Sequence, residues 1–391
     1  MAATAPAWYG RFGGAYVAAP LVPIVRALSE AFALAHADAQ FRAELSDLLA
    51  TFGGRPTPLH RLRRFGGAHS AAIWIKREDL AYTGGNYINS AAGQCLLARR
   101  LDARAVVCDT GSGHNGVATA AAAAALGLAC TVFMGATDYH VQAVMVARMR
   151  ALGADVRAVD SGAAILSEAV SAAYQAWMGG APETVYVSGA PVGPAPYPAM
   201  VRAFQAIAGE ELAAQIARAY GGAPAAILAT LGGGGSAIGL FTPFLARCDT
   251  RLIVAQSVRL PPTGPQLRLG EARLGVLHGA RTLVLQDVSG SVVAPSELAP
   301  GLRYPAASPE IAHLWETQRV EAVAVDASDA LTAQAELART EGILASIDSC
   351  HALAAAQVIA RDLPTDRYIV VGINAADDGS VETVGGCDGV N

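Results

Sequence analysis

Short apolar runs rich in β-branched residues alternate along the chain with alanine-rich stretches. Such runs are typical of strands buried in mostly parallel sheets, and the longer stretches between them fit helices. The alternation predicts an α/β protein with open, mostly parallel sheets. The expected strands are residues 72–75, 105–108, 130–134, 155–159, 184–187, 226–231, 252–255 and 368–373.

Helices are expected between these strands, at residues 87–100, 117–126 and 141–152, and the last is expected to stop at Gly153. Residues 259–293 are rich in Pro, Gly and Arg and show no clear periodicity. We interpret them as a long irregular segment that covers the site.

The stretch 116–136 is apolar enough to resemble a membrane span, but Gly127 interrupts it. We interpret it as a buried helix followed by a buried strand. The N-terminus shows no basic segment followed by an apolar one, so no secretory signal is recognised and the cytoplasm is expected.

The 391 residues are enough for two domains, and 53% of them are hydrophobic, so large cores are expected. The net charge of −5 and the absence of long runs of like charge argue against nucleic acid and anionic membranes as partners. Small molecules or proteins remain as the expected partners.

The six cysteines are scattered, without a C-x-x-C motif or a histidine at metal-ligand spacing, so reduced thiols and no metal are expected. They are Cys95, Cys108, Cys130, Cys248, Cys350 and Cys387. Lysine is far rarer than arginine, and Lys76 is the only lysine of the chain.

Two glycine-rich loops each follow an expected strand and precede a helix. The first, TGSGHNG at residues 110–116, has the G-x-G-x-x-G spacing, and with Asp138 it permits a dinucleotide-site interpretation. The second, GGGGS, consists of Gly232, Gly233, Gly234, Gly235 and Ser236. Backbone amides without side chains in the way can enclose a phosphate or another anion, so the pair predicts a ligand with two anionic ends.

A series of motifs in constant order resembles the β subunit of tryptophan synthase. They are GRFGGAY at 10–16, GRPTPL at 54–59, KREDL at 76–80, the two glycine loops, GPAPYP at 193–198, GLRYP at 301–305 and DSCHA at 348–352. The resemblance covers nearly the whole chain. It implies the fold type II arrangement of pyridoxal-phosphate enzymes, with the cofactor in a cleft between two open α/β domains, a homodimer, and an α-subunit-like partner.

The domain bounds expected from this resemblance are as follows. Residues 1–52 and 86–204 form an N-terminal domain, which includes a mobile subdomain at about 102–189. Residues 53–85 and 205–391 form a C-terminal domain.

The resemblance breaks at several positions where the family does its chemistry. The lysine that forms the Schiff base corresponds to Tyr87, within NYINS at 86–90, and a phenol cannot form an imine. The catalytic glutamate corresponds to Asp109, and the aspartate of the closing loop to Arg303. In the carboxylate-binding loop a glutamine and a histidine become His114 and Asn115, and the serine opposite the pyridine nitrogen becomes Asn374.

From these changes we predict no covalent cofactor and no pyridoxal phosphate held as a Schiff base. The predicted function is a repurposed enzyme of lyase or isomerase type, not a normal tryptophan synthase. It would work without pyridoxal phosphate, through acid/base chemistry on a small anionic substrate, with an aromatic or indole-like compound as one option. The reaction would be an elimination, a cyclisation, an isomerisation, or the formation or cleavage of a C–C bond. The alternatives are a noncatalytic regulatory or binding homologue, a noncovalent pyridoxal-phosphate binder, and a nicotinamide enzyme, which the family match disfavours.

The predicted catalytic residues are Tyr87 as acid or oxyanion donor, Asp109 or His114 as base, and Arg303 as a charge clamp. Predicted substrate-binding residues are Asn86, Thr110, Gly111, Ser112, Gly113, Asn115, Asp348 and Asn374. The second glycine loop is predicted to bind a phosphate or another anion.

Overall fold

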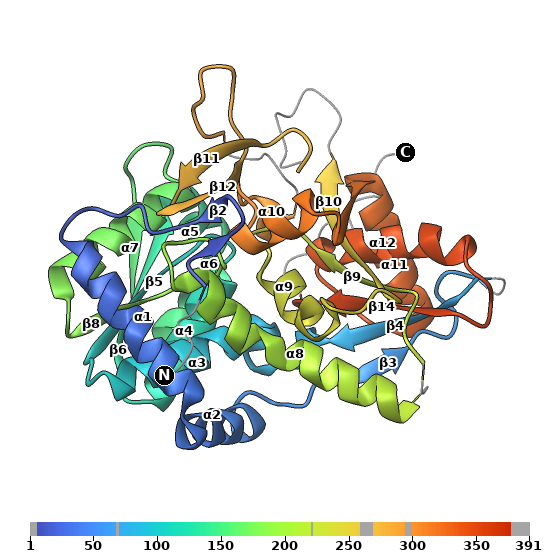
Figure 1. Cartoon of the computed structure of the whole chain (residues 1–391), viewed down its shortest axis with the longest axis horizontal. Coiled ribbons are helices and arrows are strands. Elements are labelled where there is room, and N and C mark those ends of the chain that lie inside the picture. Colours follow the sequence, from blue (N-terminus) through green and yellow to red (C-terminus); the bar gives the residue numbers. More distant parts are fainter. Residues whose placement is uncertain (1–5, 68–69, 220–221, 259–268, 294–298, 377–391) are drawn as a thin grey trace.

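The computed structural model describes residues 6–67, 70–219, 222–258, 269–293 and 299–376. Two groups of strands and helices lie side by side, and helix α8 (Tyr197–Ala219) runs along both (Figure 1). One group contains a four-stranded sheet and the other a six-stranded sheet, and a small four-stranded sheet lies beside them. The predicted α/β class with mostly parallel sheets is confirmed.

The first sheet has the order β7-β6-β5-β8, with all neighbours parallel. Its strands are β5 (Ala105–Thr110), β6 (Ala129–Gly135), β7 (Asp155–Val159) and β8 (Thr184–Val187). Helices α3 (Tyr87–Arg100), α4 (His114–Ala125) and α6 (Ala143–Ala151) cover one face. Helices α1 (Leu21–Ala37) and α7 (Leu166–Gly180), with the start of α8, cover the other. Because both faces are buried, the strands are continuous apolar runs.

The second sheet has the order β13-β10-β9-β14-β4-β3, and only β3 is antiparallel to its neighbour. Its strands are β3 (Leu59–Arg61), β4 (Ala72–Arg77), β9 (Ala226–Thr230), β10 (Arg251–Val258), β13 (Val320–Asp326) and β14 (Tyr368–Ile373). Helices α11 (Ala327–Glu341) and α12 (Ile347–Arg361) cover one face. Helices α9 (Gly235–Phe241), α10 (Pro309–Glu316) and the later turns of α8 cover the other.

The small sheet is antiparallel and has the order β1-β2-β12-β11. It consists of β1 (Trp8–Tyr9), β2 (Phe12–Gly13), β11 (Arg273–Leu277) and β12 (Ala280–Val284). The last two strands form a hairpin inside the segment that we interpreted as irregular, so that interpretation was wrong for its described part. The sequence feature that could have indicated the hairpin is the His278-Gly279 pair between its strands. Both residues have a positive φ in the structure, as a tight two-residue hairpin turn requires. Residues 259–268 of that segment lie outside the described residues.

The remaining elements connect these layers. They are α2 (Ala39–Thr51), α5 (Ala136–Val141) and the short 3-10 turns η1 (Glu78–Leu80), η2 (Tyr82–Gly84), η3 (Thr242–Phe244) and η4 (Pro300–Leu302). The helix predicted at 141–152 is present as α6, which begins two residues later than predicted, because the short helix α5 ends at Val141.

All eight expected strands are present, as β4 to β10 and β14. Strand β13 was missed, because it lies at the edge of its sheet and is only partly buried, so its sequence is not a continuous apolar run. The stretch 116–136 forms most of α4 and then β6, as predicted. In the part of the chain that the structure describes, no helix has both the length and the apolar character of a membrane span. The domain bounds given above stay a prediction.

Gly93 provides a test of the packing between α3 and α8. A Cβ atom at Gly93 would lie 2.5 Å from ring carbons of Phe204, which belongs to α8. Replacing a helical glycine by alanine normally stabilises a protein by about 0.5–1 kcal/mol. Here the overlap should make Gly93→Ala destabilising, by about 1–3 kcal/mol in urea unfolding.

The matched control is Gly179→Ala in α7, where the new Cβ would meet nothing within 4 Å. This variant should be neutral or slightly stabilising. Equal stabilisation by both variants would show that α3 and α8 do not pack as described.

Candidate active site

Two joined cavities lie at the carboxyl ends of β5, β8, β9 and β14, where open α/β sheets usually bind ligands. The glycine-loop cavity is lined by Asn86, Tyr87, Ser112, His114, Gly189, Ala190, Gln205, Thr230, Gly232, Gly233, Gly234, Gly235, Ser236, Gly301, Leu302, Asp348, Asn374 and Ala375. The Asp109 cavity is lined by Tyr87, Asp109, Thr110, Gly111, Ser112, Asn115, Leu166, Gly189, Ala190, Gly233, Pro300, Gly301 and Tyr304. Six residues, including Tyr87 and Gly233, line both, so the site is continuous.

The second glycine loop, residues 232–236, connects β9 to α9 and leaves backbone as the wall of its cavity. A Cβ atom at Gly232 would lie 2.1 Å from the carbonyl oxygen of Gly301, and one at Gly233 would lie 2.7 Å from Cβ of Ala190. Gly234 has a φ of +96°, which few other residues adopt. Side chains are therefore disfavoured at these three positions, and the loop can approach a phosphate with its backbone and with the Ser236 hydroxyl.

Asp109 lies near the end of β5 and is almost fully buried. The Tyr186 hydroxyl donates a hydrogen bond to its Oδ1, and Asn115 Nδ2 donates to its backbone carbonyl oxygen over 2.8 Å. Burial raises the pKa of the Asp109 carboxyl from its usual 3.8 to about 6, although the bond from Tyr186 lowers it. A carboxyl group with this pKa can both take up and release a proton near neutral pH.

Tyr87 is the first residue of α3 and lies between the two cavities. Its ring stacks on His114, with centroids 6.2 Å apart and an angle of 19° between the planes. Burial, followed by the nearby Asp348 and Asp109, raises the pKa of Tyr87 to about 12. The phenol is therefore protonated at neutral pH and can donate a hydrogen bond. His114 Nδ1 lies 3.2 Å from Ser112 Oγ.

The predicted anion loop at 110–116 borders the Asp109 cavity through most of its residues. Thr110 Oγ1 accepts a hydrogen bond of 3.1 Å from Gly113 N, which closes the turn. Gly113 itself does not line either cavity, and a Cβ atom there would lie 2.4 Å from Met145. Its observed role is thus to let α4 pack on α6.

Asn374 and Asp348 form the opposite wall of the glycine-loop cavity. Asn374 follows β14, and its Oδ1 accepts a hydrogen bond from Ser349 Oγ. Its backbone carbonyl accepts a 3.0 Å bond from Asn86 N, which ties the start of α3 to the second sheet. Asp348 lies at the start of α12 against Gly301.

Arg303 does not line these two cavities. It lines a neighbouring third cavity together with Asp138, Glu168, His278 and others, and its Nη1 lies 3.7 Å from Asp138 Oδ1. Leu166 lines both this cavity and the Asp109 cavity, so Arg303 lies beside the site.

Several residues of the site were not predicted from the sequence. Tyr186 was missed because it is part of an apolar strand, although β8 lies directly beside β5 and Val107 is paired with Tyr186. Tyr304 belongs to the quoted GLRYP motif, and its ring lines the Asp109 cavity. Gln205 carried no local signal, since it lies in the middle of the long helix α8.

The chain matches the family described as "Pyridoxal-phosphate dependent enzyme" over residues 50–374. It is 40% identical over 388 residues to the "Tryptophan synthase beta chain" of Streptomyces coelicolor, with 97% of this chain and 90% of that protein covered. A protein of the same name from Xylella fastidiosa (strain M12) is 40% identical over 393 residues, with 98% and 95% covered. The crystal structure of a pyridoxal 5'-phosphate-dependent aspartate racemase has a TM-score of 0.62 and 17% identity, and the match covers 88% of this chain and 97% of that one. This last likeness shows the fold alone.

These comparisons correct two predictions. We expected an enzyme that works without pyridoxal phosphate, and we expected no covalent cofactor and no pyridoxal phosphate held as a Schiff base. The matching family is named for its dependence on this cofactor, and relatives at 40% identity are tryptophan synthase β chains, so both expectations were wrong. The error came from giving most weight to a few changed positions, above all Tyr87, whereas a cofactor site is built from contacts spread over the whole cleft.

The cleft fits the phosphate of pyridoxal phosphate, since the wall of the glycine-loop cavity includes five consecutive residues with a single hydroxyl and no larger side chain. Lys76, the only lysine of the sequence, lines neither cavity, and its Nζ is bound by Thr57 O, Glu211 and Gln215. The fold, the glycine-loop cavity and the relatives agree, and the chain belongs to the tryptophan synthase β family within the pyridoxal-phosphate-dependent enzymes of fold type II.

Proposed function

We propose that this chain is a pyridoxal-phosphate-dependent enzyme of the tryptophan synthase β type, a lyase that acts on an amino acid in the cleft. The observation that carries the proposal is the junction of the glycine-loop cavity with the Asp109 cavity. The first suits the phosphate of the cofactor, and the second is lined by Asp109, our candidate acid/base group. When bound, pyridoxal phosphate supplies an electron sink for carbanion chemistry.

Asp109 is proposed as the group that moves protons. Its carboxyl lines the cavity, and Tyr186 holds Oδ1 by a hydrogen bond. With a pKa of about 6, the carboxylate form dominates above neutral pH and can accept a proton from the substrate.

Other residues are proposed to bind and orient the substrate. Thr110, Gly111, Ser112 and Asn115 border the Asp109 cavity and offer backbone and side-chain donors for a carboxylate. Tyr87 and His114 form an aromatic wall, from which the Tyr87 hydroxyl can donate. Asn86, Asp348 and Asn374 border the glycine-loop cavity, and Arg303 contributes a positive charge from the third cavity.

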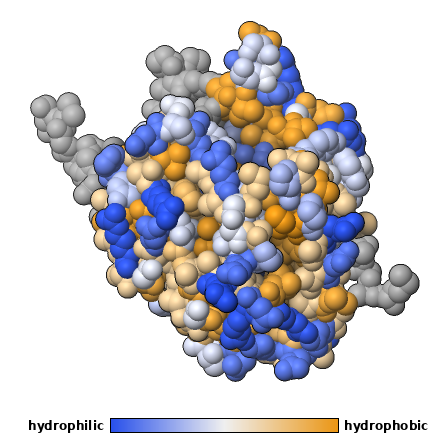
Figure 2. Space-filling model, turned by 90° about the vertical axis from the view of Figure 1, so that its left-hand side faces the viewer, coloured by the Kyte–Doolittle hydropathy of each residue, from blue (hydrophilic) through white to orange (hydrophobic). Residues whose placement is uncertain are grey.

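We also propose that the chain assembles with a second copy and with an α-subunit-like partner, because relatives carry the name of a β chain. Val141, Val144, Val288 and Val292 are 70%, 64%, 97% and 43% exposed. Val292 also lines the third cavity. Hydrophobic residues also gather toward the top of the face shown in Figure 2. Exposed apolar areas of this kind commonly bind proteins. The cytoplasmic location stays a prediction.

Gly235→Asp tests the phosphate site. A Cβ atom at Gly235 meets its nearest neighbour at 3.4 Å, an ordinary contact, so the side chain can be accommodated. The added carboxylate should repel the phosphate by roughly 1–4 kcal/mol at contact distance. We expect the affinity for pyridoxal phosphate, measured by equilibrium dialysis, to fall at least about tenfold.

Gly235→Ala is the matched control, because it adds the Cβ without the charge and should bind within about threefold of the wild type. Borohydride reduction followed by peptide mass spectrometry identifies the residue that carries any attached cofactor. Equal affinities of the wild type and Gly235→Asp would remove the glycine loop as the phosphate site.

Asp109→Asn tests the proton-transfer role. Asparagine retains an oxygen that can accept the Tyr186 hydrogen bond, but it cannot accept a proton. With pyridoxal phosphate, isotope-labelled L-serine and indole, the wild type should form a product that contains the serine carbons, measured by mass spectrometry. The variant should form it about 10²–10⁴-fold more slowly. If the wild type binds pyridoxal phosphate but converts no serine, the tryptophan synthase type of activity is refuted.

The same substitution should change the pH dependence of stability. The pKa of Asp109 is raised in the fold, so its protonated form is favoured there, and this stabilisation is lost as the pH rises from 3.8 through 6. At pH 8 Asp109→Asn should therefore be more stable than the wild type, by up to about 3 kcal/mol. The difference in unfolding free energy between the variant and the wild type should vanish near pH 4. The same difference at pH 4 and pH 8 would argue against a raised pKa of Asp109.

A further inference from the structure

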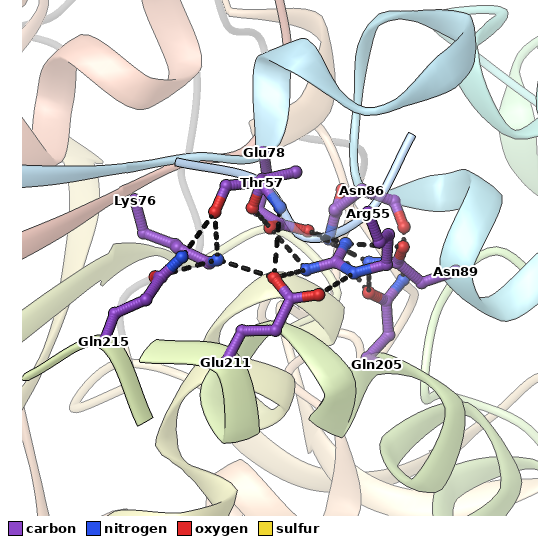
Figure 3. Close-up of polar contacts among 9 residues, drawn as sticks. All are labelled: Arg55, Thr57, Lys76, Glu78, Asn86, Asn89, Gln205, Glu211 and Gln215. Carbon is purple, nitrogen blue, oxygen red and sulfur yellow. Dashed lines mark hydrogen bonds and ion pairs between the residues drawn. The ribbon is translucent and has the colours of Figure 1, made fainter. Parts of the chain in front are cut away.

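A buried network of charged and polar side chains lies beneath the cleft, and apart from Asn86 it consists of residues to which the proposed chemistry assigns no role. It extends from Lys76 and Gln215 at one end to Asn86, Asn89 and Gln205 at the other, with Arg55, Glu78 and Glu211 between them (Figure 3). Two positive and two negative charges balance. The side chains of Arg55, Glu78 and Lys76 are 3%, 4% and 0% exposed.

Arg55 is the centre of this network, and all five of its N–H donors are used. Nε and Nη2 donate to the two oxygens of Glu211, each over 2.7 Å. Nη1 and Nη2 donate to the two oxygens of Glu78, over 2.8 and 2.9 Å. The last N–H of Nη1 donates to Asn89 Oδ1 over 2.8 Å. A guanidinium paired in this way has one orientation, because any rotation would leave buried charges without partners.

Asn89 connects the Arg55–Glu78 ion pair to Gln205 through hydrogen bonds. Its Nδ2 donates to Glu78 Oε2 over 3.0 Å and to Gln205 Oε1 over 3.3 Å. Gln205 in turn holds Asn86 twice, because Nε2 donates to the Asn86 carbonyl over 3.1 Å and Oε1 accepts from Asn86 Nδ2 over 3.4 Å. The carbonyl of Asn86 also accepts the Asn89 N–H, in the first turn of α3.

Gln205 also contacts the other side of the site. Gly239 of α9, the helix that starts in the glycine loop, packs so closely that a Cβ atom there would lie 2.6 Å from Cβ of Gln205. Both Gln205 and Asn86 line the glycine-loop cavity, and Tyr87 follows Asn86 directly. One side chain therefore touches the segment before Tyr87 and the helix after the glycine loop.

We propose that Gln205 is a positioning residue, which fixes Asn86 and Tyr87 relative to the glycine loop and is itself held by Asn89 and the Arg55–Glu78 ion pair. This inference rests on the proposed function, since it assigns Gln205 a role in forming the cofactor cleft. Without the amide group of Gln205, the first turn of α3 loosens and the cavity no longer keeps its shape.

The test compares Gln205→Leu with Gln215→Leu. Gln215 lies on the same helix at the opposite end of the network, where it donates to Thr57 O over 2.8 Å and accepts from Lys76 Nζ over 3.2 Å. It lines neither cavity of the site. Both variants lose buried hydrogen bonds, so both should lower the melting temperature, but only the first removes the contact with Asn86.

Two measurements separate positioning from a general loss of stability. Hydrogen exchange at the amides of residues 87–90 should become at least about tenfold faster in Gln205→Leu and stay within about twofold of the wild type in Gln215→Leu. The affinity for pyridoxal phosphate should fall about tenfold in the first variant only, with a changed absorption spectrum of the bound cofactor.

Equal changes in both variants, or unchanged exchange at residues 87–90 in Gln205→Leu, would overturn the inference. Faster exchange with an unaltered affinity and spectrum would overturn it as well, because the cleft would then not depend on the position of Asn86. If the wild type binds no pyridoxal phosphate, the proposed function fails, and the exchange comparison still decides whether Gln205 holds the start of α3.

Discussion

The pairing of buried charges around Arg55 is the constraint on which the geometry of the cleft depends. Arg55 joins Glu78, just after β4, to Glu211 on α8 and Asn89 on α3, so it connects segments that lie far apart in the sequence. Charges buried this deeply are tolerated only when every donor finds an acceptor. The ion pairs thus add little to the free energy of unfolding. They do restrict α3, α8 and the second sheet to a single relative arrangement.

The cleft built on this arrangement is formed largely by small residues and backbone. Gly232 lies against Gly301, Gly233 against Ala190, and Gly301 against Asp348, each so closely that a Cβ atom would overlap its neighbour. These approaches bring the end of β9, the segment before Arg303 and the start of α12 together around one cavity. A phosphate group can therefore be bound by backbone amides, without a lysine or arginine side chain in the glycine loop.

Much of the fold could be predicted from the sequence, because strands buried on both faces leave a continuous apolar signal. The edge strands β13 and β11 could not be recognised in this way, since they are partly exposed and their side chains are mixed. Strand β12 is mostly buried, but Arg281 and Thr282 interrupt its apolar run. The two glycine loops, Tyr87 and Asp109 were recognised through motifs, and the structure brings them into one site. Tyr186 and Gln205 were not recognised. Their place in the site depends on which strand or helix lies beside them, and this is determined by long-range packing.

The protonation of Asp109 depends on Tyr186 as well as on burial. The Asp109 carboxyl is almost fully buried beside the Tyr186 hydroxyl, and burial disfavours its charged form. The Tyr186 hydroxyl partly offsets this by donating to Oδ1, and burial and the nearby carboxylate raise the pKa of Tyr186 and of Tyr174 and Tyr304. These phenols therefore remain protonated at the pH where Asp109 titrates. The carboxyl can change its charge while its surroundings keep theirs, which is the condition for a group that exchanges protons with a substrate in a closed site.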